Sequence, residues 1–326
     1  MQGLPRTRFY LLPLLLLLLV AGIGRIARSW GVGHRVITAA AVECLPAELQ
    51  ERWQATHRHP VSGEEKSISD WLVTRFCHHP DWVDGPSRDE SDLAERKRAT
   101  QFVYAEKGGL FFPPIAWADP DRDPKAPRPK TYHYFTYSQE EVNRALAERG
   151  ARWYFERISE AFAAGNDVAA AEYAGAFAHA IQDRVSPFHV WDGYTPEREA
   201  LETELAEHGL QAPEGSRAGT PAHASLFWGL DGPGMKADLS DYRPISLGPS
   251  PRAAALVFTE RLFENREFAK RVFTNREGFI ATHLQDDWRN KAGSEATDAH
   301  LSAVARHNAE LTADVFFTAW KLAAGN

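Results

Sequence analysis

Apolar residues recur with a helical period along most of the chain. Between residues 34 and 53 apolar and polar positions alternate at this period, and Pro46 divides the stretch into two helices. The same spacing predicts further helices over residues 64–77, 138–165, 167–185, 197–208, 252–275, 276–290 and 295–323. No stretch shows the sustained period-two alternation of a half-buried strand. The pattern therefore predicts an all-α fold made of a single multi-helix domain.

Local signals indicate where some of these helices begin and end. Asn166 can cap the helix that follows it, and Pro187 cannot continue that helix. Residues 84–130 are rich in Pro, Asp, Arg and Gly, and residues 209–250 are rich in Gly and Pro. Both stretches are predicted to be irregular, and an excursion as long as 84–130 is usually functional or mobile.

The N-terminus has the pattern of an export signal. Two arginines precede an apolar stretch from Phe9 to Gly24, and small residues at the cleavage positions end at Ser29. The alternative is an uncleaved membrane anchor, for which sixteen apolar residues are short. We therefore expect residues 1–29 to be a signal peptide and residues 30–326 to form the helical domain, secreted or periplasmic and without a membrane span.

Charge excludes a bare nucleic-acid groove. Residues 1–29 contain four arginines and no acidic residue, so their removal changes the formal net charge from −7 to −11. Such a surface repels polyanions, so we expect no stable nucleic-acid partner, and a phosphate-containing substrate would need bound metal to attract it. The two cysteines, Cys44 and Cys77, do not form a CxxC motif, and their pairing stays open.

The strongest chemical signal is the segment HAIQDRVSPFH. His179 and Asp183 lie four residues apart and thus on one helical face, and His189 follows just after a proline turn. A single histidine on an apolar helix is more often a packed core residue. Three potential ligands within eleven residues on an alanine-rich helix instead indicate a buried metal site.

A second signal, WGVGH, directly follows the expected cleavage site. The free α-amine and carbonyl group of Trp30 can chelate a metal in a five-membered ring. Gly31 and Gly33 let the backbone fold back, so that His34 reaches the same ion. Taken alone, the segment is more typical of an ordinary start to a mature chain.

Together these motifs resemble the zinc-dependent phospholipase C and single-strand-specific nuclease superfamily. The similarity lies in WGVGHRVITAAA, PDWVD, TYHYF and HAIQDRVSPFH, and the helix order extends it over most of residues 30–323. Members of this superfamily begin with Trp at the mature N-terminus. The resemblance implies an all-α domain of the phospholipase C/nuclease type that holds two to three zinc ions.

The resemblance also implies a ligand for each ion. Trp30 and His34 would bind one zinc, and Asp183 would bridge two ions. Asp81, which could also orient the attacking water, would bind the second zinc with His133 and His179. His189 would serve a third zinc together with a histidine and an acidic residue on the next helix.

Two of these assignments stay open. Asp84 competes with Asp81, which we favour because the Pro-Asp pair resembles bacterial members of the family. At the third site the family has a histidine four residues before an acidic residue, but Arg198 stands four residues before Glu202. Glu202 is one candidate from that helix. Glu204 and His208 form a pair four residues apart in reversed order, through which His208 could bind the ion instead; otherwise the third site is weak or missing.

The remaining histidines are weaker candidates. His57, His59, His78 and His79 fall in polar stretches, which predicts solvated side chains. His283 has an aspartate four residues later, but it lies far beyond the expected interval.

The resemblance implies hydrolysis of phosphoester bonds, with Asp81 and Asp183 as catalytic residues. Such ions lower the pKa of a coordinated water, which provides a nucleophile near neutral pH. The substrate, a phospholipid or single-stranded nucleic acid, is left open by the sequence. The alternative is a non-catalytic exported protein that keeps zinc for stability, and Arg198 in the third site favours it.

Overall fold

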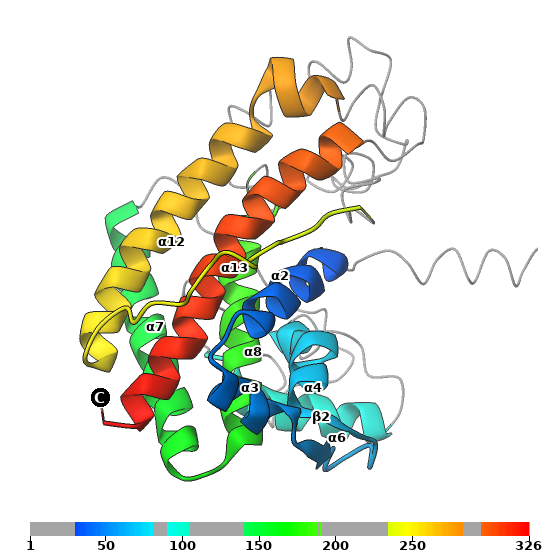
Figure 1. Ribbon diagram of the computed structural model, residues 1–326, viewed down its shortest axis with the longest axis vertical. Coiled ribbons are helices and arrows are strands. Elements are labelled where there is room, and N and C mark those ends of the chain that lie inside the picture. The colour runs from blue at the N-terminus through cyan, green and yellow to red at the C-terminus, as the bar shows by residue number, and fades with distance from the viewer. Residues whose placement is uncertain are drawn as a thin grey trace, which may run out of the picture.

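The computed structural model describes residues 30–80, 90–104, 140–187, 190, 234–282 and 295–325. Four long helices, α7 (Glu140–Ala163), α8 (Asp167–Asp183), α12 (Pro251–Phe273) and α13 (Glu295–Ala323), pack side by side as a bundle (Figure 1). Their facing sides bury large aromatic side chains, with Phe177 stacked on Tyr154 at 4.6 Å and close to Phe258 at 4.9 Å between ring centroids. The all-α prediction is confirmed.

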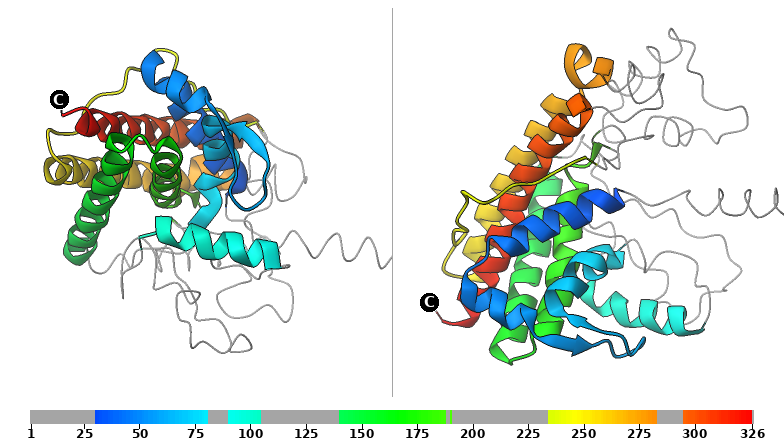
Figure 2. Two further views of the ribbon diagram at one scale, coloured as in Figure 1. Left: turned by 90° about the horizontal axis from the view of Figure 1, so that it is seen from below. Right: turned by 45° about the vertical axis from the view of Figure 1, so that its right-hand side comes forward.

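The N-terminal part of the described chain covers one side of this bundle. It contains α2 (Gly31–Glu43), α3 (Ala47–Gln54), α4 (Ile68–Thr74) and the short 3₁₀ helix η2 (Phe76–His78). Helix α2 packs against α13 and α8, and η2 packs against α8. A helix α6 (Glu90–Ala99), followed by η3 (Thr100–Phe102), runs along the outer edge (Figure 2).

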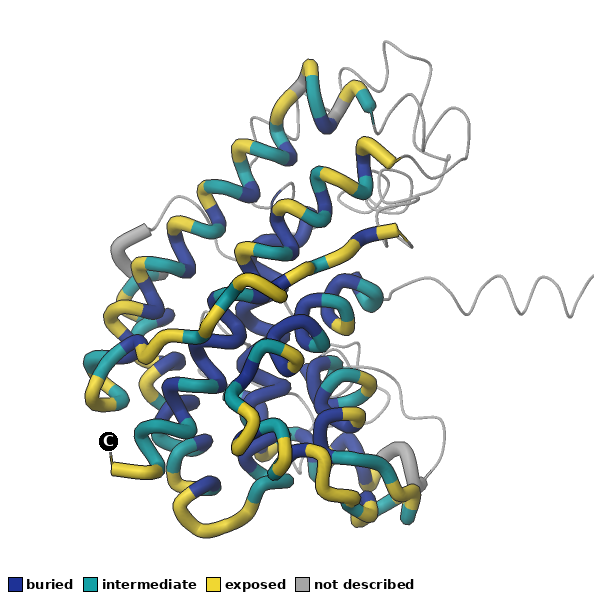
Figure 3. Tube along the Cα trace, viewed as in Figure 1, coloured by how far each residue is buried: buried dark blue, intermediate teal, exposed yellow. Residues whose placement is uncertain are grey.

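Helix α8 packs against α7, α4, α2 and η2. The Asn166 side chain accepts from Ala169 N at 3.1 Å and caps the helix, as predicted. Almost every residue from Ala170 to Asp183 is buried, as expected for a helix covered on all sides (Figure 3). At Gly175 an added Cβ would lie 2.6 Å from the carbonyl carbon of Phe76, so the glycine permits the close approach of η2.

An extended segment, residues 234–250, crosses α13 and connects to α12 (Figure 1). We call it the strap. Three of its backbone N–H groups donate to side chains along α13: Lys236 to Ser302, Ile245 to Asp314 and Leu247 to Thr318. Side chains thus provide the acceptors that a neighbouring strand would otherwise supply.

The structure corrects the helix prediction in two places. Residues 90–99, inside the stretch predicted to be irregular, form α6. The predicted helix over 64–77 begins instead with strand β2 (Glu65–Ser67), which pairs antiparallel with β1 (Thr56–Arg58) before α4 starts. Over the predicted helix 276–290, the described residues show the π-helical turn η6 (Arg276–Ile280).

The other helix predictions are confirmed within about two to three residues at each boundary. The predicted signal peptide (residues 1–29) and the predicted helix over 197–208 lie outside the described residues. Within the described ranges, no helix combines the length and apolar character needed to cross a membrane.

Candidate metal centre

Three buried polar side chains meet where α2 crosses α8. His34 comes from the first turn of α2, and His179 and Asp183 lie one turn apart near the end of α8. The exposed fractions are 0% for each histidine and 1% for Asp183. One donor atom from each residue lies within 4.8 Å of the other two, and among the described residues this is the one group of three with that property. The group could hold a metal ion.

The Asp183 carboxylate faces the Nε2 atoms of both histidines. Its Oδ1 is 3.5 Å from His34 Nε2, and its Oδ2 is 3.2 Å from His179 Nε2. The two imidazole rings stack with 4.1 Å between centroids and 23° between planes. Each carboxylate oxygen therefore faces a different histidine, although both rings lie side by side.

A backbone carbonyl determines which nitrogen of His179 can bind a metal. His179 Nδ1 lies 2.7 Å from the carbonyl oxygen of Cys77, in η2. Because a carbonyl only accepts, Nδ1 must carry the proton and donate it. In the neutral ring the lone pair is then on Nε2, the nitrogen that faces Asp183. A lone pair directed at a carboxylate oxygen in a buried space requires a cation or a proton between them.

The distances suit zinc. With ligand bonds of about 2.0–2.1 Å and tetrahedral angles, two zinc ligands lie roughly 3.4 Å apart. The two histidine-to-carboxylate distances of 3.5 and 3.2 Å match this spacing. Two imidazoles with a carboxylate form a donor set that binds zinc and other divalent transition metals, and a carbonyl partner on the far nitrogen is the usual outer support of a metal-binding histidine.

Trp30 lies immediately before this centre. Its carbonyl accepts from His34 N at 3.0 Å, and its indole is fully buried. Its φ of 29° is the one positive value among the described non-glycine residues. An added Cβ on Gly33 would lie 2.3 Å from the indole, so a glycine is needed at that position. The structure confirms the proximity of Trp30 and His34, and the role of Trp30 as a ligand stays a prediction.

The other predicted ligands all lie outside the described residues. The residues concerned are Asp81, His133, His189, Glu202 and His208, together with the competing Asp84. They stay predictions, as does the third zinc site. Of the predicted ligands, the structure thus brings together His34, His179 and Asp183, with Trp30 beside them.

Two histidines predicted to be solvated are buried. His59 is 2% exposed and His79 is 1% exposed. Burial lowers the pKa of His59 to about 4, helped by the neighbouring positive charge of Arg75, so this ring is neutral near pH 7. His78 is half-buried, and its ring centroid is 5.6 Å from that of His34. Sequence reasoning missed the burial of His59 because this side chain contacts Glu95 of helix α6, which was not predicted.

Two further residues of the centre also escaped prediction. The carbonyl of Cys77 and the amide of Gln182 contact the Nδ1 atoms of His179 and His34, respectively. A carbonyl carries no signal in the sequence. Gln182 precedes Asp183 directly, and its position on the helix that carries both predicted ligands is the one signal that could have drawn attention to it.

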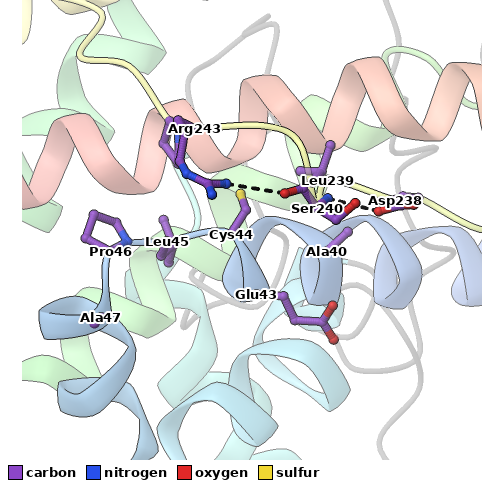
Figure 4. A pocket seen from close by; sticks show the side chains of 12 residues that line it. Ala40, Glu43, Cys44, Leu45, Pro46, Ala47, Asp238, Leu239, Ser240 and Arg243 are labelled. Atoms are coloured by element: carbon purple, nitrogen blue, oxygen red, sulfur yellow. Dashed lines mark hydrogen bonds between the residues drawn. The ribbon is translucent and has the colours of Figure 1, made fainter.

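A separate pocket of about 670 Å³ lies between the end of α2 and the strap (Figure 4). It shares no residue with the group formed by His34, His179 and Asp183. The half-buried thiol of Cys44 lines it, and burial raises the pKa of this thiol to about 11. The thiol therefore stays protonated near pH 7 and is a poor nucleophile and metal ligand. Both Cys44 and Cys77 are free thiols.

No protein-family model, curated protein or solved structure matches this chain. The superfamily resemblance of the sequence motifs thus stays an expectation. What the protein does must be inferred from the metal centre and from the residues around it.

Proposed function

We propose that this chain is an exported, zinc-dependent hydrolase of phosphoester bonds, with His34, His179 and Asp183 among its zinc ligands. The observation that carries the proposal is the position of the Asp183 carboxylate, which faces two histidine Nε2 atoms at 3.5 and 3.2 Å. The direction of the His179 lone pair, set by the Cys77 carbonyl, supports it further.

The sequence resemblance also implies more than one ion. Oδ1 of Asp183 lies nearest His34 and Oδ2 nearest His179, an arrangement that is compatible with a carboxylate bridging two ions, each with its own histidine. Trp30 would be a further ligand of one ion, and Asp81 and His133 would be further ligands of the other. His189, with Glu202 or His208, would bind a third zinc.

The reaction class follows from the chemistry of such a site together with the sequence resemblance. Bound zinc would supply positive charge for a phosphate group and lower the pKa of a coordinated water. The protein supplies two oriented imidazoles and a carboxylate at a buried position where charges are weakly screened. Because the chain without residues 1–29 carries a net charge of −11, the phosphate of a phospholipid or of single-stranded nucleic acid would be attracted by the metal centre alone.

A second candidate function is a non-catalytic zinc protein. The observation that favours it is burial: His34 and His179 are fully enclosed, and Asp183 is 1% exposed. Zinc at this point would join α2 to α8 and would stabilise the fold without contact with a substrate.

Zinc content and turnover, measured on the same samples, test both candidates. Purified wild-type protein, His179→Ala and Asp183→Ala are compared for bound zinc and for hydrolysis of a chromogenic phosphodiester. The proposal expects both variants to lose zinc and activity together, because each loses a ligand. Zinc without turnover in the wild type would favour the structural function. A His179→Ala protein with full zinc and turnover would refute the metal centre.

The chain offers a matched control in His300. Its Nδ1 lies 2.7 Å from the carbonyl of Ala296, as that of His179 lies 2.7 Å from Cys77, but it stands on α13 outside the donor group. His300→Ala therefore removes an imidazole with the same kind of carbonyl partner. This variant should keep the zinc and the turnover of the wild type.

A further inference from the structure

The amide of Gln182 connects the two helices that carry the metal donors. Its Oε1 lies 2.7 Å from His34 Nδ1, and its Nε2 donates to Thr38 Oγ1 at 2.9 Å. All three side chains are fully buried. His34 and Thr38 stand one turn apart on α2, so the two ends of one amide meet two successive positions of the same helical face.

The chemistry of the amide decides what this contact does. To present an unprotonated Nε2 to an ion, His34 must carry its proton on Nδ1 and needs an acceptor there. The Oε1 of Gln182 is that acceptor, and this orientation leaves the amide NH₂ for the hydroxyl of Thr38. In the reverse orientation the NH₂ would face Nδ1, the ring proton would move to Nε2, and metal binding through Nε2 would be blocked.

We propose that Gln182 and Thr38 are positioning residues that hold His34 in its metal-binding tautomer. Thr38 acts through Gln182, and Gln182 acts through His34. The inference rests on the proposed zinc centre. His179 obtains the same orientation from the Cys77 carbonyl. The two histidines therefore differ, because a substitution of Gln182 deletes the acceptor of His34, whereas the acceptor of His179 belongs to the backbone and is kept when the Cys77 side chain is changed.

The test is the affinity for zinc alone, measured by competition with a chromogenic chelator. Gln182→Met keeps the approximate size of the side chain and removes both ends of the amide, and it should weaken zinc binding tenfold to hundredfold. Thr38→Val should weaken binding less, and Thr38→Ser should restore it. Gln182→Glu keeps an acceptor for His34 Nδ1 and should bind zinc at least as well as the wild type, since a carboxylate is a common outer partner of a zinc-binding histidine.

A double variant tests whether Thr38 acts on His34 through Gln182, an arrangement that we call the relay, or whether the two residues have independent structural roles. If Thr38 acts through Gln182, Thr38→Val should have no further effect on zinc affinity in the Gln182→Met background. Thr259→Val is the control, because it removes another buried threonine hydroxyl, on α12, that bonds only its own helix, to Ala255 O at 2.7 Å. This control should leave zinc affinity unchanged.

Two further measurements separate positioning from folding. Unfolding of the metal-free variants by urea shows how much stability each substitution removes, and the loss of zinc affinity should remain after correction for it. In ¹⁵N-histidine-labelled, zinc-loaded protein, the His34 Nδ1 should carry a slowly exchanging proton. That proton should exchange faster in Gln182→Met, whereas the corresponding proton of His179 should not change.

The outcomes are distinguishable. Wild-type zinc affinity in Gln182→Met, or a zinc-loaded His34 protonated on Nε2, would overturn the relay and leave the zinc centre in place. Equal losses in Gln182→Met and Gln182→Glu would also overturn it, because the acceptor would then not matter. A wild-type protein that binds no zinc would overturn both the centre and the relay.

Discussion

Gly175 lets the 3₁₀ helix η2 approach α8. Substitution of Gly175 by alanine tests whether this close approach holds the Cys77 carbonyl against His179. The added Cβ would lie 2.6 Å from both the carbonyl carbon and the Cβ of Phe76, and 2.9 Å from Cys77 N. Two of these three atoms belong to the backbone, which cannot move away by changing a rotamer. Gly175 stands one turn before His179, so the clash separates α8 from the segment whose carbonyl accepts from this histidine.

The expected loss follows from two opposing effects. Overpacking of a buried contact typically destabilises by about 1–3 kcal/mol. Alanine in a helix interior is more favourable than glycine by about 1 kcal/mol, which offsets part of it. Gly175→Ala should therefore lower the free energy of unfolding by up to about 2 kcal/mol. It should also weaken zinc binding, because the Cys77 carbonyl would be displaced from His179 Nδ1.

Urea denaturation of the metal-free protein and zinc titration measure the two effects. Gly31→Ala is the control. Gly31 lies inside α2 without a positive φ, so the backbone there does not need the glycine that the sequence pattern suggested, and the added methyl group would have no atom within 4 Å. The control should be neutral or slightly stabilising and should bind zinc normally. A Gly175→Ala protein that is as stable as this control and binds zinc equally well would refute the reasoning, because the contact with η2 would then not hold the carbonyl in place.

Two other substitutions test buried charges. Burial raises the pKa of Glu172 to about 8 against the effect of Arg98, which donates to it at 2.6 Å. The folded state thus holds the proton of the Glu172 carboxyl group more tightly than the unfolded chain does. The stability that this proton contributes is fully present below pH 4.5 and is lost as the pH rises towards 8, by about 1.4 kcal/mol per pH unit. Glu172→Gln should therefore be more stable than the wild type in urea melts at pH 8 and equally stable at pH 4; a loss at pH 8 would show that the ion pair outweighs burial. Asp314→Ala should lower the free energy of unfolding by about 3–5 kcal/mol, because Arg261 and the backbone nitrogen of Ile245 in the strap would both lose the buried carboxylate that they share. A loss below about 1 kcal/mol in the same assay would contradict this expectation.

Local sequence pattern predicted most of the helices, because periodicity, capping residues and prolines act over a few neighbouring residues. Asn166 caps α8 as predicted, and the helix over residues 295–323 was predicted with the bounds of α13. The same local geometry brought one pair of donors together. His179 and Asp183 lie four residues apart, so any α-helix at this position places them on one face.

The tertiary structure decided what this pair faces. His34 reaches Gln182 across 148 residues of sequence, and the Cys77 carbonyl reaches His179 across 102. No local pattern encodes such contacts, since they depend on how closely α2 and η2 pack against α8. For the same reason the burial of His59 was missed: its own segment is polar, and its environment comes from elements elsewhere in the chain. The sequence therefore determined the donors and their spacing, while packing decided which nitrogen each histidine directs at the Asp183 carboxylate.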